Sequence, residues 1–181
     1  EVVQMMGGLA YMTGRPGDPL RAGTSVNEAT VSFPNHHLLL RALELAGLPA
    51  FRRQGWYPAY GEGWALYAET LGHEMGLYDD PNQWLGHLRM ELLRAVRLVV
   101  DTGLHAFGWS RGRSIRYMMD TQGETEAEAR QATDRYMAAP GQALGYKIGA
   151  RRFQALRQQA RAALGDRFAL ADFHDLVLSQ G

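Results

Sequence analysis

The chain has 181 residues with 19 basic and 19 acidic side chains, so its formal charge is zero when the histidines are neutral. This balance excludes a strongly basic nucleic-acid-binding protein, and 46% apolar with 21% charged residues is typical of a globular domain. We therefore expect no nucleic-acid partner. No apolar run approaches the ~18 residues needed to cross a bilayer, so we expect no membrane partner either. The absence of cysteine restricts any metal site to His, Asp or Glu ligands.

Glycine and proline interrupt any long helical or strand period over residues 1–34, which predicts a loop-rich N-terminal segment. From residue 35 onward, apolar residues recur at helical spacing, and no stretch alternates apolar and polar residues for long. We therefore predict an all-α fold with one helical domain over 35–181.

Start and stop signals set the bounds of the predicted helices. Asp80 followed by Pro81 is typical of a capped helix start, and Thr125 with Glu128 forms a capping box. The helix after Pro81 carries an apolar stripe of the kind that packs on a core, formed by Leu85, Leu88, Leu92, Val96, Val99 and Gly103. The predicted ranges are 35–47, 60–78, 81–107, 110–119, 125–139, 141–164 and 171–178.

Two groups of side chains are candidate metal ligands. The adjacent imidazoles of His36 and His37 follow a proline at a predicted helix start, where they either face a metal or cap the helix. Glu62 and Glu69 lie on one face of a predicted helix, about 10 Å apart along its axis, so only one of them would bind a given ion. For His73, and likewise for His87, the simpler prediction is a contact at the solvent-exposed surface.

Further polar residues interrupt the apolar pattern near the middle of the chain. Asp101 is four residues before His105 and can fix its tautomer, as a catalytic imidazole requires; alternatively Arg94, Arg97, Asp101 and His105 form a buried ion-pair ladder. Tyr136 and Tyr146 flank the helix break at Pro140, where a phenol either reaches a cleft or packs structurally. Arg135 and Tyr136 are the predicted substrate-binding residues.

Four motifs in this order resemble the bacterial family called domain of unknown function 885: A-Y-G-E-G-W-A-L-Y-A-E, R-A-V-R-L-V-V-D-T-G-L-H-A-F-G-W-S, R-Y-M-A-A-P-G-Q-A-L-G-Y-K-I-G and F-H-D-L-V-L. The resemblance covers about residues 34–181, and the family's large N-terminal helical portion is absent from this sequence. Exposed apolar surface left by that portion predicts a homodimer.

The family resembles helical, zincin-like metallopeptidases similar to the carboxypeptidase Taq family. The resemblance implies peptide hydrolysis on zinc held by His36 or His37 and Glu62. It also implies that His105 and Tyr146 stabilise the transition state.

The family hallmark H-E-A-x-P-G-H-H is degenerate here. Aligned on the proline without a gap, its first His and its general base become Thr30 and Val31; a gapped alignment keeps Glu28 as the base. A missing general base costs about 10² to 10⁴ in rate. We therefore expect low zinc occupancy and weak or no hydrolysis. The alternative is a non-catalytic helical binding or structural module, and the sequence leaves localisation open.

Overall fold

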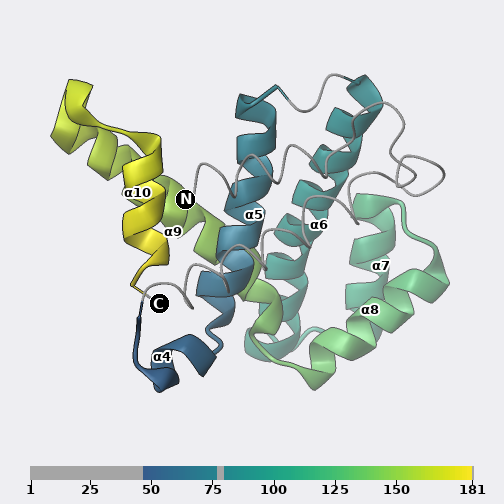
Figure 1. Cartoon of the computed structure of the whole chain (residues 1–181). Helices are drawn as coiled ribbons and strands as arrows, with labels where there is room; N and C mark the ends of the chain where they lie inside the picture. The colour runs from purple at the N-terminus through teal and green to yellow at the C-terminus, as the bar shows by residue number, and fades with distance from the viewer. Residues whose placement is uncertain (1–46, 77–79, 181) are drawn as a thin grey trace, which may run out of the picture.

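The structure is a computed structural model that describes residues 47–76 and 80–180. This part of the chain is helical and contains no strand, which confirms the all-α prediction (Figure 1). Its elements are α4 (Ala50–Gln54), α5 (Pro58–Glu74), α6 (Pro81–Ala106), α7 (Arg111–Gln122), α8 (Glu126–Ala138), α9 (Gln142–Leu164), the short 3-10 helix η2 (Gly165–Arg167) and α10 (Leu170–Leu178). None of the helices in these ranges is long and apolar enough to span a membrane.

Side-chain caps begin three of these helices where the sequence predicts. The carboxylate of Asp80 accepts from the Asn82 amide at 2.8 Å, and Ser110 caps α7 in the same way. At α8, the Thr125 hydroxyl and the Glu128 carboxylate form both halves of the predicted capping box. Local sequence therefore determines these boundaries, because each cap satisfies amide groups that the first helical turn leaves without partners.

Other elements differ from the prediction. α5 begins two residues early, because Pro58 occupies its first turn, and it ends at Glu74. α4 and η2 are too short for an apolar period to reveal. The predicted helix over 35–47 lies outside the described residues except for Gly47.

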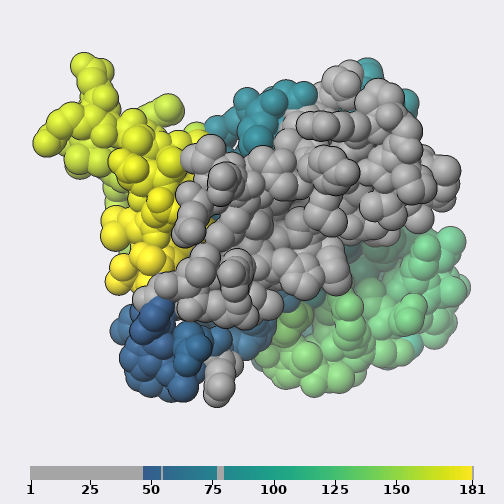
Figure 2. All heavy atoms as spheres, viewed as in Figure 1, coloured from purple at the N-terminus to yellow at the C-terminus, as the bar shows by residue number. Residues whose placement is uncertain are grey.

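α9 organises the fold, because it packs against both α5 and α6 (Figure 1). It runs in the same direction as α5 and opposite to α6, on which α7 and α8 also pack. Two apolar clusters result. The first joins α5, α9 and α10 around Trp64, and the second joins α6, α7, α8 and the start of α9 around Val100. The far end of α9 and η2 project from one side of the molecule (Figure 2).

Glycines allow α5 and α9 to approach at backbone distance. A Cβ atom built on Gly149 would lie 1.9 Å from the Ala59 carbonyl oxygen and 2.7 Å from the Gly63 Cα atom. A Cβ on Gly145 would lie 2.9 Å from the carbonyl carbon of Pro58. The helix crossing therefore depends on the missing side chains at these positions.

α6 buries a different face from the one its apolar stripe predicts. Of the stripe, Leu85, Leu88, Leu92 and Val99 are exposed, while only Val96 and Gly103 are buried. The buried face instead carries polar residues at helical spacing: Gln83, His87, Arg94, Arg97 and Asp101. The expected surface position of His87 is therefore wrong: its ring is buried and stacks on Trp84, and burial lowers its pKa. A row of buried polar groups indicates a site rather than a simple core contact.

Candidate functional site

Two buried arginines on α6 form the centre of the polar face. The side chain of Arg94 is 7% exposed and that of Arg97 is 4% exposed. The Arg97 guanidinium carbon lies 4.4 Å from the ring centroid of Tyr146 and 5.2 Å from that of Tyr136, and Arg94 lies 5.5 Å from Tyr146. Cation–π contacts of this kind stabilise a desolvated guanidinium. They do not satisfy its N–H groups.

Three nitrogen donors of this pair have no acceptor among the described residues. Arg97 donates from Nη2 to the Gln142 side-chain oxygen at 3.0 Å, but its Nε has no hydrogen-bond partner in the described part of the chain. The same holds for Nε and Nη1 of Arg94. A buried donor left unsatisfied costs about 1–3 kcal/mol, and more when the group is charged. The pair can therefore bind a carboxylate or another anion that supplies acceptors.

Asp101 has a structural partner other than the predicted one. Both of its carboxylate oxygens lie 3.1 Å from the backbone nitrogen of Gly141, the residue that caps α9, and its side chain is 2% exposed. His105 instead lies with Nε2 3.0 Å from the Tyr136 carbonyl oxygen. The expected Asp101–His105 pair is thus not formed, because the α9 N-terminus takes the carboxylate.

Replacing Asp101 with alanine is expected to lower the free energy of unfolding by about 2 kcal/mol, since a buried N–H group would lose its acceptor. Asp101→Asn keeps an amide oxygen and is expected to recover about half of that loss. Urea unfolding followed by circular dichroism measures both changes. If both variants unfold within about 0.5 kcal/mol of the wild type, Asp101 does not hold α9.

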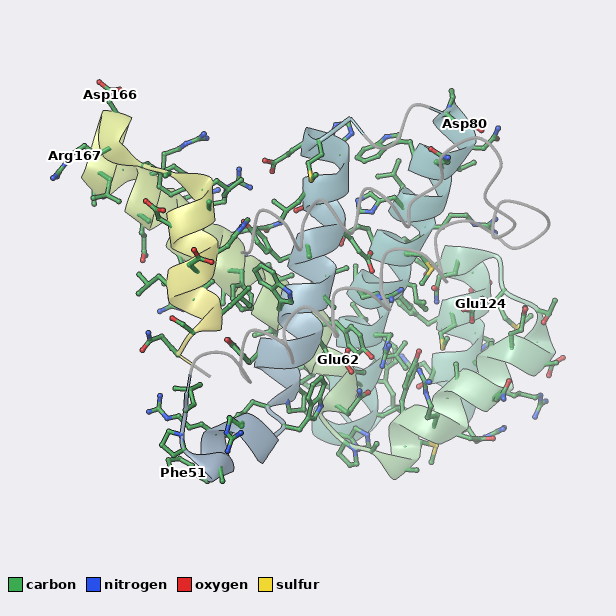
Figure 3. All side chains as sticks on the ribbon, in the orientation of Figure 1. Phe51, Glu62, Asp80, Glu124, Asp166 and Arg167 are labelled. Carbon is green, nitrogen blue, oxygen red and sulfur yellow. The ribbon has the colours of Figure 1, made fainter. Side chains whose placement is uncertain are left out.

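Glu62 and Tyr146 both lie at the crossing of α5 and α9. Glu62 directly precedes Gly63, whose backbone packs against that of Gly149. Tyr146 lies one helical turn before Gly149. Figure 3 shows Glu62 near the middle of the molecule, in the lower part of α5. The carboxylate side chain is 8% exposed, and Tyr146 packs on the first apolar cluster while facing the arginines. The crossing therefore places Tyr146 beside the arginine pair and Glu62 on α5, the helix that packs against α9.

The predicted substrate-binding residues differ in exposure. Arg135 is exposed on α8, with its guanidinium 5.6 Å from the Tyr136 ring. Tyr136 is 3% exposed within the second apolar cluster, and burial raises the pKa of its phenol. Its side chain is a core residue, which agrees with the structural alternative; its role in binding substrate stays a prediction.

Only part of the predicted zinc site falls within the described residues. Glu28, His36 and His37 are outside the described residues. Within residues 47–76 and 80–180, no three His, Asp or Glu side chains are grouped as metal ligands. Glu62 alone therefore represents the predicted zinc site in the described part of the chain, and the zinc prediction is not tested.

One buried polar pair has no counterpart among the predicted sites. The Tyr67 hydroxyl lies 2.8 Å from Nε2 of His174, inside an aromatic cluster with Trp64 and Phe153. Burial lowers the pKa of His174 to about 4, an effect reinforced by the Arg157 charge and opposed by Glu74. Burial likewise raises the pKa of Tyr67 to about 12. Both groups are therefore neutral near pH 7, which suits a structural hydrogen bond better than acid–base chemistry.

Comparison with known proteins agrees with part of the predicted resemblance. The family profile described as "Bacterial protein of unknown function (DUF885)" matches residues 24–181. A search of curated proteins finds no match.

Two solved structures are similar to this chain. One is the crystal structure of a putative lipoprotein from Colwellia psychrerythraea, whose sequence is 51% identical to this chain. The TM-score is 0.78, and the match covers 82% of this chain and 26% of that one. A putative lipoprotein of unknown function from Shewanella oneidensis is 26% identical with a TM-score of 0.76, covering 83% and 28% respectively. The chain thus spans about a quarter of the length of these relatives.

Proposed function

The chain belongs to the bacterial family of unknown function DUF885, and we propose that it forms the substrate-recognition part of a peptide hydrolase resembling zinc metallopeptidases. In this proposal, Arg94 and Arg97 bind a carboxylate of the peptide, with Tyr146 beside them. Glu62 is the carboxylate that would help to hold zinc. Turnover is expected to be weak, because in the ungapped alignment Thr30 and Val31 replace the first histidine and the base of the hallmark; the gapped alignment keeps Glu28 as the base.

The unsatisfied N–H groups of the arginine pair carry this proposal. The described residues around the pair supply one side-chain acceptor, Gln142, and two aromatic faces. On the same helix, the carboxylate of Asp101 is held by Gly141, and that of Glu91 pairs with Lys147. A guanidinium presents N–H donors in a planar fork that matches a carboxylate. A peptide carboxylate would therefore satisfy donors that the described part of the protein leaves open.

Zinc would supply a bound water of lowered pKa for the attack on a peptide bond. Glu62 suits this role in chemical type, because its carboxylate is buried near the helix crossing. One carboxylate does not make a site, and a catalytic zinc site has three protein ligands as a rule. The remaining ligands would come from His36 or His37, as the resemblance implies.

Exchange of Glu62 for Gln is expected to reduce zinc retained after dialysis at least tenfold, because an amide is a poorer ligand than a carboxylate. Glu69→Gln is the matched control. It changes a second buried carboxylate two turns along the same helix, and the proposal assigns that carboxylate no zinc. Metal content and chelator-sensitive cleavage of a mixed peptide library are measured for all three proteins. Equal zinc in the two variants, or no zinc and no chelator-sensitive cleavage in the wild type, would remove the zinc proposal.

A second candidate function is a non-catalytic helical binding or structural module. One observation favours it: His105, a predicted transition-state donor, uses Nε2 on the Tyr136 carbonyl oxygen. In that case we expect Glu62→Gln to leave the melting temperature and peptide binding unchanged. Metal-dependent stability that is lost in this variant would count against the module.

We also propose that the chain forms a homodimer through exposed apolar surface. Among the described residues, we place the dimer interface on the exposed leucines of α6, which are Leu85, Leu88 and Leu92.

A further inference from the structure

A pocket of about 510 Å³ opens where α5, α9 and α10 meet, away from the arginine pair. Its size falls within the range of small-molecule sites. Apolar side chains from the three helices form most of its wall. The lining residues are Ala59, Tyr60, Ile148, Gly149, Arg152, Phe153, Leu156, Val177 and Gln180.

Hydrogen bonds hold the walls of this pocket in place. The Tyr60 hydroxyl donates to the Val177 carbonyl oxygen at 2.8 Å and lies 3.3 Å from that of Leu178. Arg52 donates from Nη1 to the Gln180 carbonyl oxygen at 2.7 Å. These contacts tie the end of α10 to α4 and α5, so the pocket is formed before any ligand binds.

Among the described residues that line the pocket, Arg152 is the one that carries a charge, and none of them is acidic. Its guanidinium makes no hydrogen bond or ion pair with the described residues, and it is exposed at the rim, one helical turn after Ile148. An apolar pocket with a lone cation at its mouth is complementary to an apolar chain that ends in an anion.

We propose that this pocket binds a single-chain fatty carboxylate, with the acyl chain along Tyr60, Phe153 and Leu156 and the carboxylate on Arg152. The C-terminal apolar residue of a peptide shares part of this chemistry. Its several amide groups, however, would lose water with few partners to gain, because the helical backbone of the lining is internally bonded and Gln180 is the one side-chain amide among the described lining residues. The apolar wall therefore favours an acyl chain.

Calorimetric titration of the full chain with decanoate tests the proposal. We expect saturable one-to-one binding of decanoate. Its affinity should be about fivefold higher than that of decan-1-ol, which is the largest gain that an exposed contact between a cation and a carboxylate provides. Arg152→Met keeps an apolar stem and is expected to abolish the preference for the carboxylate. Ile148→Glu is expected to weaken decanoate binding at least tenfold, because it places an acid at the mouth and pairs with Arg152.

Leu164→Glu is the matched control, since it adds the same charge at an exposed leucine of α9 outside the pocket. It is expected to bind decanoate like the wild type, with helix content checked by circular dichroism for every variant. Non-saturable binding, equal affinity of the two glutamate variants, or a loss of Gly-Gly-Leu binding in Ile148→Glu as large as the loss of decanoate binding would each overturn the proposal.

Discussion

Replacing Gly149 with alanine is expected to lower the free energy of unfolding by about 3 kcal/mol or more. The new methyl group would overlap the Ala59 carbonyl oxygen, and it would also meet the Gly63 backbone. Neither obstacle is a flexible side-chain end, so α5 and α9 must move apart. That movement would disturb the apolar cluster around Trp64 and Tyr67. Thermal unfolding followed by circular dichroism should show a melting temperature lower by about 10 °C.

The matched control is Gly112→Ala, because the nearest obstacle to its new methyl group is the end of the Arg116 side chain at 3.7 Å. Gly112 lies in the first turns of α7, where alanine is the better helix former. We expect this variant to be unchanged or up to about 1 kcal/mol more stable. Similar stabilities for the Gly149 and Gly112 variants would contradict the close helix crossing.

Acidification is expected to destabilise the protein through His174 by about 3 kcal/mol between pH 6.5 and pH 4. Burial lowers the pKa of this imidazole from 6.5 to about 4 in the folded state, so the unfolded chain binds the proton first as the pH falls. The stabilising contribution is therefore complete above pH 6.5 and is lost progressively toward pH 4. Denaturant unfolding at pH intervals of 0.5 between 4.5 and 6.5 measures this slope.

The variant His174→Phe removes the titrating group and is expected to have a shallower slope by about 1.4 kcal/mol per pH unit. It should be less stable at pH 7, because the buried Tyr67 hydroxyl loses its hydrogen bond to His174. Leu176→Ala is the control on the same helix, since its side chain is exposed and does not titrate. A His174→Phe slope equal to that of the control would show that His174 does not titrate as described.

Local signals explain why the helix boundaries could be predicted. Caps such as Asp80 and Thr125 act within one turn of the chain, so their outcome depends on neighbouring residues alone. Proline at the first turn behaves similarly. These features require no knowledge of the tertiary structure.

The face of α6 could not be predicted in the same way. The apolar period around Leu88 and Leu92 indicates a core contact, yet α9 packs on the neighbouring face that carries Arg94 and Arg97. Which face is buried depends on the partner helix and its aromatic rings, which are remote in sequence. The sequence pattern allows a buried ion-pair ladder for the arginines, but their partners are tyrosine rings rather than acids.

The close crossing of α5 and α9 at their glycines and the hydrogen bond between Tyr67 and His174 cannot be predicted from the local sequence either. Glycine within a helix predicts weakness of the helix, and only the approach of Ala59 gives Gly149 a packing role. Tyr67 and His174 are 107 residues apart, and neither has a distinctive local pattern.

Peptide binding to the arginine pair tests the central claim most directly. Calorimetry compares acetyl-trialanine carrying a free C-terminal carboxylate with the same peptide as its amide. The wild type should bind the free acid at least tenfold more tightly, as buried charge-assisted hydrogen bonds provide. Arg97→Met should lose this preference, whereas Arg113→Met, which removes a cation stacked on Trp109 outside the site, should keep it. Equal binding of acid and amide by the wild type, or equal losses in the two variants, would contradict the proposed anion site.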